Sequence, residues 1–103
     1  MEFNEYQQQD KNFGNYNKIL GPYATSLNLV SSVGKLSDTL AQVLNRTEGV
    51  INDKDMKKIQ LYLGDILHDV SSTATSLGID LDDIAMTNIR KNYLLHQKEI
   101  ENK

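Results

Sequence analysis

Apolar residues recur at spacings of three and four positions along most of this chain, which is the period of amphipathic α-helices. The clearest row lies in a predicted helix over residues 22–45 and consists of Leu29, Val33, Leu36, Leu40 and Val43. The next predicted helix follows Asn52-Asp53 and carries a row made of Ile59, Leu63, Ile66, Val70, Ala74 and Leu77. No segment alternates apolar and polar residues as a strand would, so the sequence predicts an all-α fold.

Residues with known positional preferences mark the ends of these helices. Pro22 suits a first helical turn, Asn52 or Asp53 can cap the next helix, and Gly78 suits its C-terminal end. Asp80 is predicted to cap a fourth helix by accepting a hydrogen bond from the backbone N–H near Asp83. This helix carries Leu81, Ile84, Ala85 and Ile89 and frays from about residue 97.

A first helix, rich in Gln and Asn, is predicted over Phe3–Phe13. Gly14-Asn15 interrupts it, and a link containing Leu20-Gly21-Pro22 follows. The two long helices, joined by a short loop, should pack antiparallel, with the fourth helix covering them. We therefore predict one domain, residues 1–103, folded as a four-helix antiparallel bundle to which the first helix adds a bundle element or a dimer interface. A core this small favours pairing with a second copy.

Composition narrows the classes of function. The 103 residues include 11 basic and 14 acidic side chains and no cysteine, and the net charge is -3. The basic residues are scattered, so no nucleic-acid partner is expected. The absence of cysteine excludes disulfides and cysteine metal sites. The N-terminus does not resemble a signal peptide, and no apolar run reaches the roughly 18 residues of a membrane helix, so we expect a cytoplasmic protein without a membrane partner.

Recognisable catalytic motifs are missing from the sequence. His68 and His96 are too few and too far apart for a zinc triad, and His68 is predicted to be an exposed helical histidine. The chain has no glycine-rich phosphate loop and no G-x-S-x-G elbow. Asp82 and Asp83 fall in a first helical turn, where their charge favours the helix end.

An ordered set of short segments resembles the MazG-like all-α nucleoside triphosphate pyrophosphohydrolases, especially short phage-type members. FNEYQ at residues 3–7 is similar to their usual start, and LVSSVGKL at 29–36 is similar to their L-x-E-E-V-G-E-L. LYLGDIL at 61–67 resembles E-E-L-G-D-V-L, LGIDLDDI at 77–84 resembles L-G-I-D-L-E-E-I, and NIRK at 88–91 resembles N-x-x-K. The resemblance extends from about residue 3 to 93.

The family splits a nucleoside triphosphate into a monophosphate and pyrophosphate, using Mg²⁺ held by E-x-x-E and E-x-x-D pairs. The matching positions here are Ser32 and Lys35 in the first pair and Tyr62 and Asp65 in the second. Only Asp65 keeps a carboxylate, and one ammonium beside it cancels its charge, whereas Mg²⁺ prefers several oxygen ligands at about 2.1 Å. The metal site is therefore degenerate, Asp65 is its one remaining candidate ligand, and no cofactor is expected unless the family activity survives with Mg²⁺. A relocated site could instead use Asp65, His68 and Asp69.

By the same resemblance, Asn88 and Lys91 would face nucleotide phosphates, although a solvated helix surface explains them equally well. Tyr62 could stack on a base or fill the emptied pocket. The resemblance also implies a homo-oligomer, a dimer or a tetramer. We expect a homologue that has lost hydrolysis and binds a nucleotide or a protein. The alternatives are an active pyrophosphohydrolase with an altered metal site and a helical interaction module with no nucleotide link.

Overall fold

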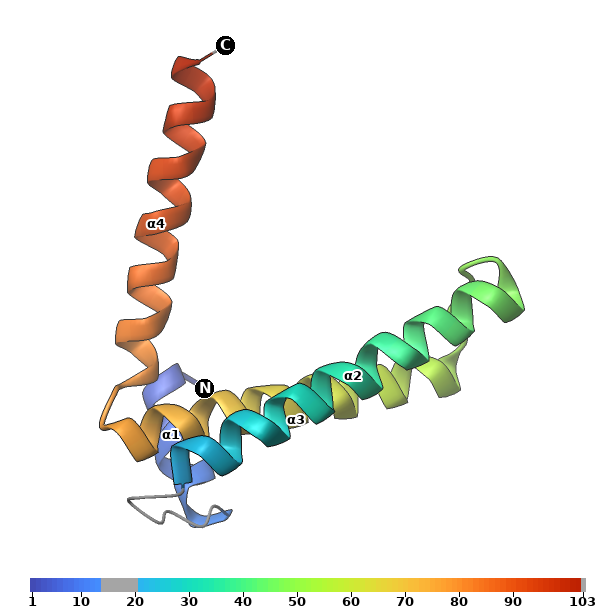
Figure 1. Ribbon diagram of the computed structural model, residues 1–103, viewed down its shortest axis with the longest axis horizontal. Coiled ribbons are helices and arrows are strands. Elements are labelled where there is room, and N and C mark those ends of the chain that lie inside the picture. The colour runs from blue at the N-terminus through green and yellow to red at the C-terminus, as the bar shows by residue number, and fades with distance from the viewer. Residues whose placement is uncertain (14–20, 103) are drawn as a thin grey trace.

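The computed structural model describes residues 1–13 and 21–102, and in these ranges the ordered elements are all helical. The elements are α1 (Phe3–Asp10), the short 3-10 helix η1 (Lys11–Phe13), α2 (Gly21–Thr47), α3 (Asp53–Leu77) and α4 (Leu81–Glu101). The all-α prediction is confirmed (Figure 1). The predicted break at Gly14-Asn15 and the link residue Leu20 lie outside the described residues.

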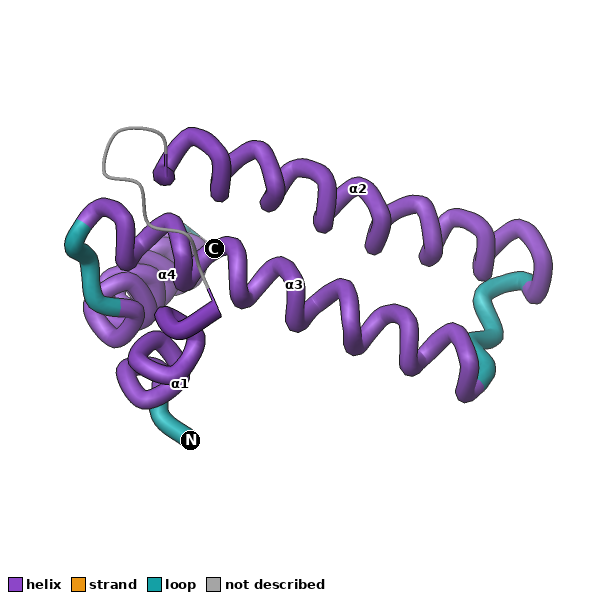
Figure 2. Tube along the Cα trace, turned by 90° about the horizontal axis from the view of Figure 1, so that it is seen from below, coloured by secondary structure: helices purple, strands orange, loops and turns teal. Residues whose placement is uncertain are grey.

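The two long helices α2 and α3 form an antiparallel hairpin, as predicted (Figure 2). Buried and half-buried residues recur at spacings of three and four along both helices and define a seam. Contacts across this seam include the Thr73 Oγ1 to Thr25 Oγ1 hydrogen bond of 2.7 Å. The seam consists of Thr25, Leu29, Ser32, Leu36, Thr39 and Val43 on α2 and Asp55, Ile59, Tyr62, Ile66, Asp69 and Thr73 on α3.

The seam agrees only in part with the apolar rows predicted from the sequence. Leu29, Leu36 and Val43 lie in it as predicted. Val33, Leu40 and Leu63 were expected to face the core, yet their side chains are 43%, 41% and 51% exposed. Ser32, Thr39 and Tyr62, one position earlier, lie in the seam instead. The hairpin therefore buries a mixed polar and apolar row, while apolar side chains on the next row stay outside.

These outer apolar residues form one surface of the hairpin. Each follows a seam residue by one position. In an antiparallel pair of helices, the row that follows the seam on one helix lies on the same side of the pair as the row that follows it on the other. We call this surface the open face; it consists of Val30, Val33, Leu40 and Leu44 on α2 and Met56, Leu63 and Leu67 on α3, all 36–71% exposed. The residues that precede the seam, including Lys35 and Asp65, lie along the opposite side.

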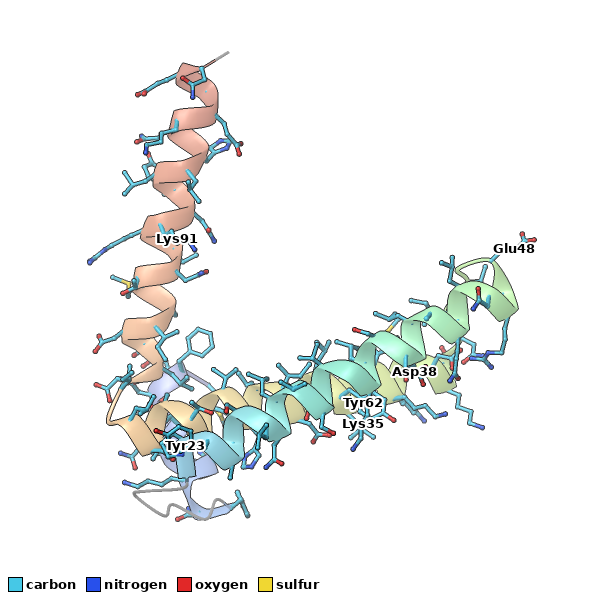
Figure 3. All side chains as sticks on the ribbon, in the orientation of Figure 1. Tyr23, Lys35, Asp38, Glu48, Tyr62 and Lys91 are labelled. Atoms are coloured by element: carbon cyan, nitrogen blue, oxygen red, sulfur yellow. The ribbon has the colours of Figure 1, made fainter. Side chains whose placement is uncertain are left out.

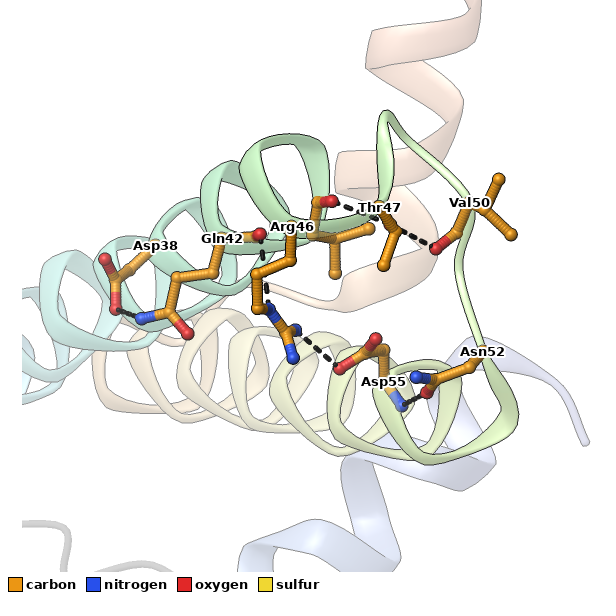
Figure 4. A network of polar contacts seen from close by, with 8 residues as sticks. Asp38, Gln42, Arg46, Thr47, Val50, Asn52 and Asp55 are labelled. Atoms are coloured by element: carbon orange, nitrogen blue, oxygen red, sulfur yellow. Dashed lines mark hydrogen bonds and ion pairs between the residues drawn. The ribbon is translucent and has the colours of Figure 1, made fainter.

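Polar contacts hold the turn between α2 and α3 (Figure 4). Asn52 caps α3, because its side-chain oxygen accepts from the backbone N–H of Asp55 at 2.8 Å. The Thr47 hydroxyl lies 2.8 Å from the carbonyl oxygen of Val43 and 2.6 Å from that of Val50. Arg46 Nη2 lies 3.3 Å from a carboxylate oxygen of Asp55, which is buried. The predicted cap at Asn52 is thus confirmed.

Helix α1 packs against the corner where the chain turns from α3 into α4. Gly78 ends α3 in the left-handed conformation, with φ of 72°, as predicted. Asp80 precedes α4 but makes no side-chain cap hydrogen bond, so its predicted capping role is wrong. Gln7 instead accepts from the backbone N–H of Leu81 at 2.9 Å, and Asn4 accepts from that of Asp82 at 3.3 Å. These N–H groups find partners on another helix, which leaves the Asp80 carboxylate with no capping role.

Helix α4 leaves the rest of the molecule at a wide angle to the hairpin (Figure 1). Only its first turns are covered; Leu81 is 4% exposed, whereas every described residue from Met86 onward is exposed. The prediction that the fourth helix covers the hairpin is therefore wrong for the single chain. The helix also continues to Glu101, beyond the predicted onset of fraying at residue 97. No described helix is both long enough and apolar enough to cross a membrane.

Candidate functional site

The four positions that the resemblance to the MazG-like enzymes would assign to metal ligands lie on α2 and α3. Ser32 and Tyr62 are half-buried in the seam, whereas Lys35 and Asp65 are exposed beside it. Figure 3 shows Lys35 and Tyr62 on the side of the hairpin away from α4. Asp65 lines a shallow hollow on the outside of α3 with Lys57 and Leu61. The structure thus places the four side chains along one edge but does not join them in a single cluster.

Ser32 is hydrogen-bonded to a different acid from the one that the sequence suggested. Its hydroxyl donates to a carboxylate oxygen of Asp69 across the seam at 2.8 Å. Asp69 is 6% exposed, while Asp65, one turn earlier, is exposed. Asp69 is therefore the carboxylate that α3 presents to α2 at this level of the hairpin.

A second buried carboxylate lies where α1 crosses α3. Asp10 is 8% exposed, and one of its oxygens lies 2.6 Å from Nδ1 of His68. The other oxygen of Asp10 is buried and has no hydrogen-bond partner among the described residues. His68 is half-buried, so the prediction that it is an exposed helical histidine is wrong. This pair ties the end of α1 to α3.

Tyr6 stands close to both buried acids. Burial raises the pKa of its phenol above 10.0, and the negative charges of Asp10 and Asp69 raise it further. The folded protein therefore favours the neutral phenol more strongly than the unfolded chain does. It follows that this contribution to stability is fully present below pH 10.0 and is lost as the pH rises through the folded-state pKa.

We expect a Tyr6→Phe variant to lose less stability than the wild type as the pH rises above about 10, the usual tyrosine pKa. The other four tyrosines remain in both proteins, so the difference between their stability curves isolates Tyr6. Urea unfolding at a series of pH values measures this difference. Parallel curves through pH 11 would show that Tyr6 ionises freely in the folded protein.

Among the described residues, no three acidic or histidine side chains are placed to hold a metal ion. The relocated site considered for Asp65, His68 and Asp69 is not assembled, because each side chain has different surroundings. Asp65 is exposed on the outer surface, His68 pairs with Asp10, and Asp69 accepts from Ser32. In this arrangement His68 joins α3 to α1 and Asp69 joins α3 to α2.

Asn88 and Lys91, the two predicted phosphate-binding residues, come together on α4. They line a hollow of about 370 Å³ with Ile79, Asp83, Ile84 and Thr87. Asn92 donates to the side-chain oxygen of Asn88 at 3.2 Å, which leaves the N–H donors of the Asn88 amide available. The site offers an ammonium and amide donors to an anion, but the Asp83 carboxylate opposes it.

Sequence reasoning missed the roles of Gln7, Asp10 and Asp69. Asp69 had a signal, since it continues the 59-62-66-69-73 spacing of the α3 seam. The other two had none, because they act through contacts between α1 and residues 58 to 74 positions later.

Comparison with known proteins gives one weak likeness. The chain is 26% identical to the Gene 37 protein of Mycobacterium phage L5 over 78 aligned residues. These residues make up 76% of this chain and 68% of that protein. No family model matches the sequence. No solved structure matches it either.

Proposed function

We propose that this chain is a helical protein-binding module with the layout of the MazG-like pyrophosphohydrolases and without their magnesium-dependent hydrolysis. The observation that carries the proposal is the open face, whose seven apolar side chains are 36–71% exposed. A group of exposed apolar side chains on one side of a helix pair is typical of a protein interaction site. The phage protein to which the chain is similar supports a phage origin, and we place the activity in the cytoplasm.

The residues at the former ligand positions support the absence of hydrolysis. Ser32 and Tyr62 offer a hydroxyl and a phenol, and Lys35 offers an ammonium, none of which is negative at neutral pH. The buried carboxylate of Asp69 already accepts a hydrogen bond from the Ser32 hydroxyl. Three lost carboxylates leave too few oxygen ligands to bind Mg²⁺ between the helices.

We expect no pyrophosphate release when the purified protein is incubated with each common ribo- and deoxyribonucleoside triphosphate and Mg²⁺ or Mn²⁺. A coupled pyrophosphate assay should give the same rate as buffer alone. Turnover that is lost in Asp65→Asn or Asp69→Asn, and kept in the control Asp38→Asn, would establish the alternative of an active enzyme with an altered site.

A nucleotide-binding role is the second candidate, favoured by the hollow that brings Asn88 and Lys91 together. It predicts that a triphosphate at 100 times its Kd raises the free energy of unfolding by about 2.7 kcal/mol. The increase should be absent in Lys91→Ala and present in the control Lys98→Ala, which changes another exposed lysine of α4. A thermal shift assay with millimolar nucleotide measures it, and a flat response in the wild type would rule this candidate out.

A further inference from the structure

Helix α4 carries an apolar row that residues 1–13 and 21–102 leave uncovered. Met86, Ile89, Tyr93 and Ile100 follow at spacings of three, four and seven positions, with His96 between the last two, and are 53%, 66%, 62% and 58% exposed. In proteins most helical stability comes from packing an apolar side against other elements. The Met86–Ile100 row, which we call the α4 row, has no such packing within the part of the chain that the structure describes.

The surface area of the chain shows how much remains to be covered. The protein exposes 8080 Å², whereas a folded monomer of 11.7 kDa exposes about 5900 Å². The radius of gyration is 16.9 Å, compared with about 13 Å for a compact domain of this length. Covering the excess of about 2200 Å² on each of two chains would bury about 4400 Å², within the range of permanent homodimers.

The chain's own α4 is not placed to cover the open face. Gln7 donates to the Ile79 carbonyl oxygen at 2.9 Å and to Thr75 at 3.2 Å, and it accepts from Leu81 N–H at 2.9 Å. One side chain on α1 thus holds the last turn of α3, the link and the first turn of α4 together. Folding α4 back onto its own hairpin would break this arrangement.

We propose that a second copy of this chain covers the open face, with the α4 row of each protomer seated along the hairpin of the other. This inference rests on the proposed function, because it names the partner that the open face binds. Each copy contributes one hairpin and one α4, so a two-fold dimer contains the same contact twice.

The two surfaces match in length, and the α2 part of the open face carries no charge. The α2 part of the open face, from Val30 to Leu44, is about 21 Å long, and the α4 row from Met86 to Ile100 is also about 21 Å long. The 27 residues of α2 include only three charged side chains, Lys35, Asp38 and Arg46, and none belongs to the open face. Depletion of charge from an exposed helix surface is typical of the centre of an interface.

Analytical ultracentrifugation of the full chain tests the proposal. We expect the wild type to sediment as a dimer of the 11.7 kDa chain. Leu44→Asp in the open face and Tyr93→Asp in the α4 row should each raise the dimer Kd about a hundredfold or more, because each introduces a charge into both copies of the contact. The controls are Leu61→Asp and Leu94→Asp, at residues that are 69% and 60% exposed and lie outside both surfaces.

Mixing the two disruptive variants distinguishes this arrangement from other dimers. A mixed pair can combine the unaltered α4 of the Leu44→Asp chain with the unaltered hairpin of the Tyr93→Asp chain, so one contact is intact. We therefore expect the mixture to dimerise more tightly than either variant alone. If α4 paired with α4 and hairpin with hairpin, every contact would carry one change and mixing would restore nothing.

Each outcome decides between the two proposals. A wild type that stays monomeric at 100 µM, or a dimer for which mixing restores nothing, would overturn the α4-on-hairpin inference and leave the protein-binding role standing. Pyrophosphate release in the hydrolysis assay would overturn the proposed function and would not bear on the dimer. Circular dichroism of each variant shows whether it keeps its helices, so loss of folding is not mistaken for loss of association.

Discussion

Replacing Gln7 with alanine is expected to lower the free energy of unfolding by about 3 kcal/mol, because three hydrogen bonds of about 1 kcal/mol each are lost. These bonds join Gln7 to Thr75, Ile79 and Leu81. The loss also leaves the first N–H group of α4 without the acceptor that caps it, since Asp80 makes no cap hydrogen bond. The angle between α4 and the hairpin should then vary.

Two measurements test this expectation, with Gln8→Ala as the matched control. Gln8 lies next to Gln7 on α1 and is exposed, so its replacement should change stability little. Urea unfolding gives the free energy of each variant. Because the chain has no cysteine, spin labels at Lys54→Cys and Lys98→Cys report the distance between hairpin and α4. Gln7→Ala should broaden that distance distribution, and an unchanged distribution with unchanged stability would show that Gln7 does not hold the corner.

The helices were predictable because their signals are local. Asn52 begins α3 and Gly78 ends it through contacts with residues a few positions away, so both ends of this helix could be identified from the sequence alone. The seam was predicted in part. Leu29, Leu36 and Val43 lie in it as expected, but hydropathy favoured Val33 and Leu40 over Ser32 and Thr39. In the structure the polar residues face inward, since Ser32 and Thr73 find hydrogen-bond partners across the hairpin. A row defined by hydropathy alone therefore combined residues of the seam with residues of the open face.

The sequence predicted which helices carry the residues of the candidate site but not which of these residues face each other. The sequence placed Ser32, Lys35, Tyr62 and Asp65 on facing helices, which the antiparallel hairpin reproduces. It could not show which residues stand at the same level, because that depends on the register between α2 and α3. The Ser32 to Asp69 hydrogen bond fixes this register and selects Asp69 as the opposing acid.

The triple variant Ser32→Glu, Lys35→Glu, Tyr62→Glu is expected to fold with a stability that depends on magnesium. A carboxylate at position 32 would face the buried carboxylate of Asp69, because the Ser32 hydroxyl already lies 2.8 Å from it. Without metal, such unpaired charge in the seam should cost about 3–5 kcal/mol. Mg²⁺ at 100 times its Kd should restore about 2.7 kcal/mol, since it binds only the folded protein.

The control for charge is the triple variant Ser32→Gln, Lys35→Gln, Tyr62→Gln, which has side chains of similar size and should show no response to Mg²⁺. Thermal unfolding in chelator and in millimolar Mg²⁺ compares the two variants. Adding Asp69→Asn to the glutamate variant should weaken its response, because the register makes Asp69 a ligand. If the glutamate variant folds and melts at the same temperature with and without Mg²⁺, these positions do not correspond to the metal ligands of the MazG-like enzymes.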